Sequence, residues 1–314
     1  MHPPEVLAIG RISVDLYSVE ADAGFDVQQT FTKSIGGSPT NVAVAAARLG
    51  RRSAIVTKVG DDALGAYARA RLKGFGVLTD FVGTQPGGQT PLALAALAPP
   101  ETPQVLFYRG SAAPDTQLVP TDLRDDVVRE APLLWMSFSA LAQGSTAETC
   151  RNWLRERNRA THTVLDLDYR PALWTDIGAA RAAASAAIDL ATVVVGNREE
   201  CDMALGTSDP DAAVDALLGR GVDLAIVKLG GDGAYLADRT GRVQVAPTRV
   251  DVVCGLGAGD AFGAALAHGL LSGWDRAAIG EFASAAGAYV AARLTCADDM
   301  PAEADVRALM EATR

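Results

Sequence analysis

The segment whose residues could most clearly do chemistry is glycine-rich and runs Gly-Leu-Gly-Ala-Gly-Asp-Ala-Phe from Gly255 to Phe262, directly before an apolar helical pattern. Glycines at alternate positions before a helix let several backbone N–H groups point at one spot, where the helix N-terminus favours an anion. Asp260 places a carboxylate at this point. Two interpretations remain open: a phosphate site beside an acid, or an ordinary turn whose aspartate caps the helix.

A second segment near the N-terminus has the same character. Gly36 and Gly37 precede a helical pattern in which Thr40 could cap the helix and Asn41 offers both a donor and an acceptor. A plain turn with a cap would use the same residues. Neither segment is a Walker loop, and neither has the spacing of a dinucleotide-binding turn.

Together the two segments resemble the two signatures of the ribokinase, or PfkB, family of sugar kinases, which are G-G-x-x-x-N and G-A-G-D. The resemblance extends over nearly the whole chain. It implies an α/β fold, ribokinase-like, with a central, mostly parallel sheet flanked by helices and a small β-sheet lid. It also implies ATP with Mg²⁺ as cofactors and phosphoryl transfer to a sugar hydroxyl, a reaction that depends mainly on positioning and charge neutralisation.

The resemblance also assigns roles to residues. Asp260 would be the catalytic base, and the amides of Gly257, Ala258 and Gly259 the anion hole. The pair Asn197 and Glu200 matches the N-x-x-E element, with Glu200 holding Mg²⁺ indirectly through water. The residues implied in nucleotide binding are Asn197, Lys228, Gly230, Gly233, Gly257, Gly259 and Ala286. The segment 254–256 departs from the D-T-x of the family, which places a monovalent-cation site in doubt.

The acceptor side is expected to include Asp15, Gly36, Gly37 and Asn41 around the sugar hydroxyls. Two arginines, Arg109 and Arg170, would bind a carboxylate, because planar guanidinium groups suit that anion; ordinary surface ion pairs are the alternative. The string D-x-D-Y-R-P-x-x-W at 166–174 resembles family members that phosphorylate 5-dehydro-2-deoxygluconate in inositol breakdown. Members acting on 2-keto-3-deoxygluconate or another sugar are the alternative.

Two further interpretations assign the chain to other classes of protein. Asp166 and Asp168 at a strand end could be the carboxylates of a phosphatase, although that motif usually lies near the N-terminus. The chain could also be a catalytically silent sugar or nucleotide sensor on a kinase fold. The retained Asp260 and its glycines argue against a silent protein.

Composition excludes further classes. The chain has 314 residues, 28 basic and 38 acidic, for a net charge of −10, so it lacks the basic field that nucleic-acid binding requires. Its 49% hydrophobic content supports a large core. The four cysteines are widely spaced, which predicts reduced thiols. With no signal-peptide pattern or long apolar run, we expect a cytoplasmic protein that does not bind membranes.

Short apolar runs alternate with alanine-rich helical patterns, which is typical of β-α-β units in one sheet. We expect a single kinase domain over 1–314. Segments 12–35 and 90–108 alternate in character instead, which predicts antiparallel strands of a small lid; an edge extension of the main sheet is the alternative. A homodimer through the lid is possible. The expected strands are Val6–Ile9, Ser53–Val59, Leu133–Ser137, Thr163–Asp168, Thr192–Val195 and Leu224–Leu229, and the expected helices are Thr40–Leu49, Ala63–Lys73, Thr146–Arg159, Ile177–Leu190, Ala258–Leu271 and Arg276–Ala292.

Overall fold

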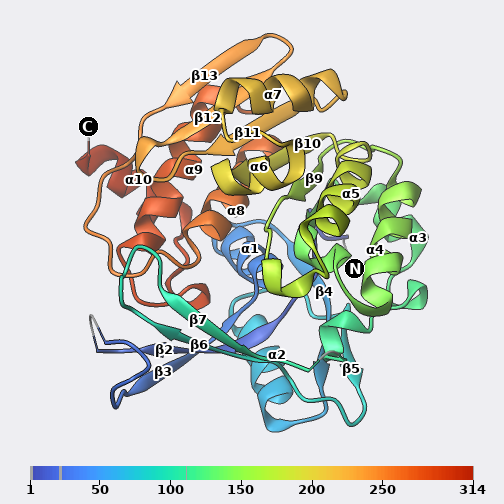
Figure 1. Cartoon of the computed structure of the whole chain (residues 1–314), viewed down its shortest axis with the longest axis vertical. Coiled ribbons are helices and arrows are strands. Elements are labelled where there is room, and N and C mark those ends of the chain that lie inside the picture. The colour runs from blue at the N-terminus through green and yellow to red at the C-terminus, as the bar shows by residue number, and fades with distance from the viewer. Residues whose placement is uncertain (1–2, 21–22, 111, 314) are drawn as a thin grey trace.

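The computed structural model, which describes residues 3–20, 23–110 and 112–313, is built around a nine-stranded sheet (Figure 1). The strand order is β13-β12-β11-β10-β9-β8-β1-β4-β5; the strands from β11 to β5 are parallel, and β12 and β13 are antiparallel. The bounds are β1 (Val6–Ile9), β4 (Ser53–Gly60), β5 (Val82–Gln85), β8 (Leu133–Ser137), β9 (Thr163–Asp166), β10 (Val193–Asn197), β11 (Leu224–Lys228), β12 (Ala234–Asp238) and β13 (Gly241–Val245).

Helices cover both faces of this sheet. Strand β1 shows why, because Val6 and Ala8 enter the core on one face while Leu7 and Ile9 enter the core on the other. Helices α1, α2, α8, α9 and α10 pack on the first face and α3 to α7 on the second. The bounds are α1 (Ser38–Arg48), α2 (Ala63–Gly74), α3 (Asp125–Glu130), α4 (Gly144–Arg157), α5 (Ile177–Ile188), α6 (Arg198–Leu205), α7 (Pro210–Gly219), α8 (Ala258–Leu271), α9 (Arg276–Ala291) and α10 (Glu303–Ala312).

The fold class predicted from the sequence is confirmed, and the expected elements differ mainly at their ends. Helix α1 begins at Ser38, before the expected Thr40, because Pro39 is tolerated in the first turn of a helix. Strand β9 ends at Asp166 and does not reach Asp168. None of the described helices is both long and apolar enough to span a membrane.

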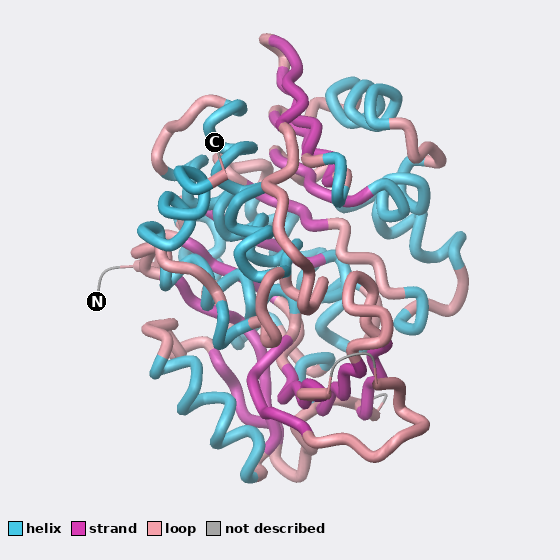
Figure 2. The backbone as a smooth tube through the Cα atoms, turned by 90° about the vertical axis from the view of Figure 1, so that its left-hand side faces the viewer, coloured by secondary structure: helices cyan, strands magenta, loops and turns pink. Residues whose placement is uncertain are grey.

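The two alternating segments form a separate four-stranded sheet in the order β3-β2-β6-β7, with β2 (Ser13–Ser18), β3 (Phe31–Gly36), β6 (Leu92–Ala96) and β7 (Gln104–Tyr108). The alternative of an edge extension is therefore wrong. The expectation of antiparallel strands is wrong for one pair, since β2 and β6 are parallel. These two strands are joined through β3, α1, β4, α2 and β5, and such a long connection permits parallel pairing. Figure 2 shows the small sheet beside the larger layers.

The parallel strands end at one edge of the main sheet, and this edge is where a doubly wound sheet binds ligands. Arg11 follows β1, Asp166 ends β9, Asn197 ends β10 and Lys228 ends β11. The N-terminal turns of α1 and α8 meet the same edge, since these two helices pack against each other. The small sheet lies opposite this edge of the main sheet (Figure 1).

Candidate active site

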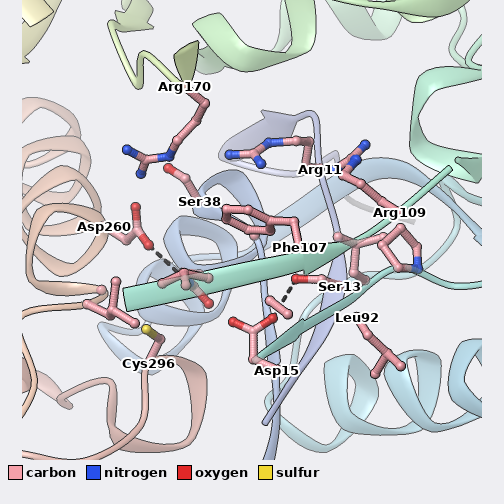
Figure 3. A pocket seen from close by; sticks show the side chains of 18 of the residues that line it. Arg11, Ser13, Asp15, Ser38, Leu92, Phe107, Arg109, Arg170, Asp260 and Cys296 are labelled. Carbon is pink, nitrogen blue, oxygen red and sulfur yellow. Dashed lines mark hydrogen bonds between the residues drawn. The ribbon is translucent and has the colours of Figure 1, made fainter. Parts of the chain in front are cut away.

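A cavity of about 90 Å³ lies between this edge and the small sheet (Figure 3). The cavity is lined by the residues that the sequence predicted to bind the sugar acceptor. The exception is Gly36, which adjoins the cavity in β3. The lining residues are Arg11, Ile12, Ser13, Asp15, Tyr17, Gly37, Ser38, Asn41, Pro91, Leu92, Ala93, Val105, Phe107, Arg109, Arg170, Leu256, Gly257, Asp260 and Cys296.

Asp260 lies in the first turn of α8. The helix begins at Ala258, and its N-cap Gly257 has φ 78°, a left-handed conformation that favours glycine. Asn41, in the first turn of α1, donates from Nδ2 to Asp260 Oδ2 at 2.7 Å. Burial raises the pKa of Asp260 to about 6, although hydrogen bonds from Asn41 and Ser38 lower it. The two predicted signature segments thus meet at one carboxylate.

Asp15 lies in β2 on the small sheet. Its Oδ1 accepts a hydrogen bond of 2.6 Å from Ser13 Oγ, and its Oδ2 accepts one of 3.1 Å from Tyr17 Oη. Burial raises its pKa. A Cβ at Gly36 would collide with this carboxylate, and a Cβ at Gly37, where φ is 99°, would lie 2.5 Å from the carbonyl oxygen of Arg11. Both glycines therefore let the backbone approach the acceptor pocket closely.

Arg109 follows β7 and reaches from the small sheet to the main body. One Nη donates to Asp115 Oδ1 at 2.6 Å, and Asp115 Oδ2 accepts from the backbone N–H of Ile12 at 3.2 Å. Burial raises the pKa of Asp115, and the guanidinium of Arg109 opposes this effect. Nε of Arg109 is buried without a hydrogen-bond partner.

Arg170 and Arg11 share a second buried carboxylate, Asp168. Arg170 lies 2.8 Å from Asp168 Oδ1, while Arg11 donates to Oδ2 at 3.2 Å and Ser137 Oγ donates to Oδ2 at 2.9 Å. Burial raises the pKa of Asp168, but the two guanidinium groups outweigh this effect and hold it well below its usual range. The alternative in which Asp166 and Asp168 are phosphatase carboxylates does not suit an Asp168 that is held by two guanidinium groups.

Arg11 and Asp115 were not predicted as site residues from the sequence, and Asp168 was considered only in the phosphatase alternative. Arg11 stands two positions after the end of a buried strand, and this position was the one available signal. The partner of Arg109 could not be identified, because ion pairing depends on the path of the chain after β7.

Lys228 ends β11 with its ammonium between two acids, 3.7 Å from both Asp166 Oδ1 and Glu200 Oε2. Burial alone would lower its pKa, but the two carboxylates raise it. Burial raises the pKa of Asp166 to about 7, against the effect of Lys228 and with the help of Glu200. A Cβ at Gly259 would lie 3.4 Å from Lys228 Nζ, so this ammonium adjoins the glycine-rich turn.

Asn197 and Glu200 form a capping box at the start of α6. Glu200 N–H donates to Asn197 Oδ1 at 2.8 Å, and Asn197 N–H donates to Glu200 Oε2 at 2.7 Å. No three His, Cys, Asp or Glu side chains are arranged to hold a metal within the described part of the chain. Mg²⁺ commonly uses only one or two carboxylates beside phosphates and water. The buried Asp166 Oδ1, which has no hydrogen-bond partner, and the adjacent Glu200 fit that mode.

The remaining predicted nucleotide residues lie outside the cavity. Gly230 and Gly233 flank the turn between β11 and β12, and a Cβ at Gly233 would collide with the carbonyl of Val245. Ala286 on α9 is fully buried in the core. Cys254 is buried as well, so a thiol stands where the family pattern has a carboxylate.

Comparisons with known proteins show what the whole chain is similar to. The model of the pfkB family carbohydrate kinases matches residues 3–303. The 5-dehydro-2-deoxygluconokinase of Bacillus subtilis (strain 168) is 30% identical, covering 98% of this chain and 96% of the relative, and that of Geobacillus thermodenitrificans (strain NG80-2) is 32% identical, covering 95% and 90%. The crystal structure of fructokinase with bound ATP from Xylella fastidiosa has a TM-score of 0.86 at 25% identity, covering 98% of this chain and 99% of that one.

Proposed function

The chain belongs to the pfkB family of carbohydrate kinases, and we propose that it transfers the γ-phosphoryl group of ATP to the 6-hydroxyl of 5-dehydro-2-deoxy-D-gluconate, a step of myo-inositol breakdown. Relatives of about the same length that bear the name of this activity support the acceptor. The observation that carries the proposal is the cavity itself, where Asp260 and Asp15 share one space with three arginines. A sugar acid supplies hydroxyls for the acids and a carboxylate for the arginines.

Asp260 acts as the general base. Its carboxylate accepts the proton of the 6-hydroxyl while the sugar oxygen forms a bond to the γ-phosphorus and the bond to ADP breaks. The amides of Gly257, Ala258 and Gly259 neutralise the negative charge on the phosphoryl oxygens. A pKa of about 6 keeps Asp260 mostly ionised at neutral pH while leaving it a stronger base than an exposed carboxylate.

The nucleotide binds along the ends of β10 and β11, next to this turn. Its partners in the proposal are Asn197, Lys228, Gly230, Gly233, Gly257, Gly259 and Ala286. Glu200 would hold Mg²⁺ indirectly, through water, with Asp166 beside it, and the metal bound with ATP would supply neutralisation of the phosphate charge. Lys228 adds a fixed positive charge to the same region.

On the acceptor side, Asp15 and Asn41 bind sugar hydroxyls, with Gly36 and Gly37 allowing their close approach. Arg109 and Arg170 bind the carboxylate. We further propose that the small sheet acts as a lid on one kinase domain over 1–314 and offers a surface for a homodimer. Four buried free thiols favour the cytoplasm as its compartment.

The test is ADP release with ATP and Mg²⁺, comparing 5-dehydro-2-deoxygluconate, 2-keto-3-deoxygluconate, fructose and ribose as acceptors. A clear preference for the first supports the proposal. Preference for the second retains the mechanism and moves the enzyme to another pathway. No acceptor-dependent turnover with any of them would favour the silent-sensor alternative.

A further inference from the structure

Arg11 is one of the three arginines in the cavity, and two side chains hold its guanidinium group. Its side chain is only 10% exposed. Its Nε donates to Ser139 Oγ at 2.9 Å and one Nη donates to Asp168. A guanidinium has five N–H donors, so these two contacts fix its plane and leave further donors for a ligand. Figure 3 shows its head between those of Arg109 and Arg170.

Arg109 offers a matching donor. Its buried Nε has no hydrogen-bond partner, and a buried unsatisfied donor is unfavourable unless a ligand accepts a hydrogen bond from it. Arg11 and Arg109 also line a second space of about 10 Å³ together with Ser139 and Thr116. A space of this size holds roughly one small atom or water.

The guanidinium groups of Arg11 and Arg109 lie close enough to repel each other, although carboxylates pair with both and Asp15 and Asp260 line the same cavity. Three guanidinium groups share two carboxylates, Asp168 and Asp115. The positive charge of Arg11 also lowers the pKa of Arg109, beside the larger effect of burial, which shows that the two like charges feel each other. A bound anion would relieve this repulsion.

The arginines differ in their distance from the reacting end. Figure 3 shows Arg170 on the side of Asp260 and Arg109 on the far side. A six-carbon acid phosphorylated at its last hydroxyl must place its carboxylate away from the base. Arg11 and Arg109 offer donors at that end, and Arg170, which the proposed function also assigns to the carboxylate, approaches from the side of the base.

Resting on the proposed function, we propose that Arg11 determines specificity for a sugar acid by binding its carboxylate together with Arg109, and that Asp168 positions Arg11 for this contact. Asp168 links Arg11, after β1, with Ser137 at the end of β8. The same carboxylate pairs with Arg170, so one buried group sets the spacing of two arginines.

The test compares Arg11→Gln and Arg11→Lys with the wild type. For each variant, kcat and KM are measured with a sugar acid and with neutral fructose, and ATP binding is measured by calorimetry. We expect Arg11→Gln to raise KM for the acid by about 10- to 100-fold, as for loss of a charge-assisted contact. The effect on fructose and on ATP affinity should stay within about threefold. Arg11→Lys keeps the charge but loses the planar guanidinium group. Its KM for the acid should lie between those of the wild type and Arg11→Gln.

Arg51→Gln is the matched control, since Arg51 is also largely buried, pairs with Glu5 and does not line the cavity. It should leave the acid-to-fructose ratio unchanged. Equal losses with both acceptors in Arg11→Gln would make Arg11 merely structural and overturn the inference while the proposed function stands.

If the wild type prefers a different sugar acid and Arg11→Gln raises KM for that acid but not for fructose, the inference is supported although the proposed substrate is wrong. A wild type that accepts only neutral sugars would overturn both. If Arg11→Gln does not fold, the KM values of Arg11→Lys for the acid and for fructose test the inference in the same way.

Discussion

Replacing Asp260 with asparagine separates the chemical role of this carboxylate from its cost to stability. The asparagine keeps an acceptor oxygen for Asn41 Nδ2, which donates to Asp260 Oδ2 at 2.7 Å. It removes the charge and the ability to accept the hydroxyl proton. We therefore expect a folded protein that still binds ATP, with kcat lowered by about 10²- to 10⁴-fold, or roughly 3 to 5 kcal/mol of barrier.

The same substitution should stabilise the fold at neutral pH. Burial raises the pKa of Asp260 from its ordinary value of 3.8 to about 6, and at about 1.4 kcal/mol per pH unit this disfavours the ionised form by up to about 3 kcal/mol. A raised carboxyl pKa means that the native state binds the proton more tightly than the unfolded state. The gain from asparagine is thus largest above pH 6, shrinks as pH falls from about 6 to 4, and vanishes below the unfolded pKa.

The assay pairs coupled ADP release with urea unfolding of wild type and Asp260→Asn at pH 8 and pH 4. Asp80→Asn is the control, because Asp80 is exposed and does not line the cavity. Wild-type kcat in Asp260→Asn would refute the assignment of the base. A lower stability at pH 8 would refute the argument from burial.

Three more predictions follow from the same contacts. For the free enzyme, log kcat/KM should fall with a slope of one per pH unit below about 6, because Asp260 must be ionised to accept a proton; a flat profile from pH 5 to 8 would contradict this. Gly36→Ala should displace Asp15 and raise KM for the acceptor at least tenfold, whereas Gly74→Ala, whose Cβ would meet nothing within 4 Å, should keep wild-type kinetics. Arg170→Ala should raise KM for a sugar acid far more than for fructose, and equal effects would show that Arg170 does not bind the carboxylate.

The sequence predicted the main sheet well because its strands are continuous apolar runs between alanine-rich helices. Strand β8, for example, is buried along its whole length. It predicted the strands of the small sheet from their alternation but not the parallel pairing of β2 with β6. Alternation identifies a strand with one buried face and carries no information about the direction of its neighbour.

The sequence predicted site residues where the backbone geometry requires a glycine. It missed residues whose charged side chains pair with residues far away in the sequence. Gly257 needs its left-handed conformation, so a glycine there has a local cause. Arg11 and Asp168 are 157 positions apart in the sequence, and no local pattern links them. Their contact exists because β1 and β9 both flank β8 and end at the same edge.

Arg170 lies between the proposed carboxylate site and the proposed base, Asp260. Its positive charge lowers the pKa of Asp260, although burial and the hydrogen bonds of Asn41 and Ser38 have larger effects. A substrate carboxylate bound near Arg170 would offset that charge, so Asp260 should become more basic in the complex. The pH profile of kcat reports the pKa of Asp260 in the complex, and that of kcat/KM reports the pKa in the enzyme without acceptor. With ATP saturating throughout, the acidic limb of the kcat profile should therefore lie at higher pH than that of the kcat/KM profile. Arg170→Ala should abolish the difference, and identical limbs in the wild type would show that the two groups are not coupled.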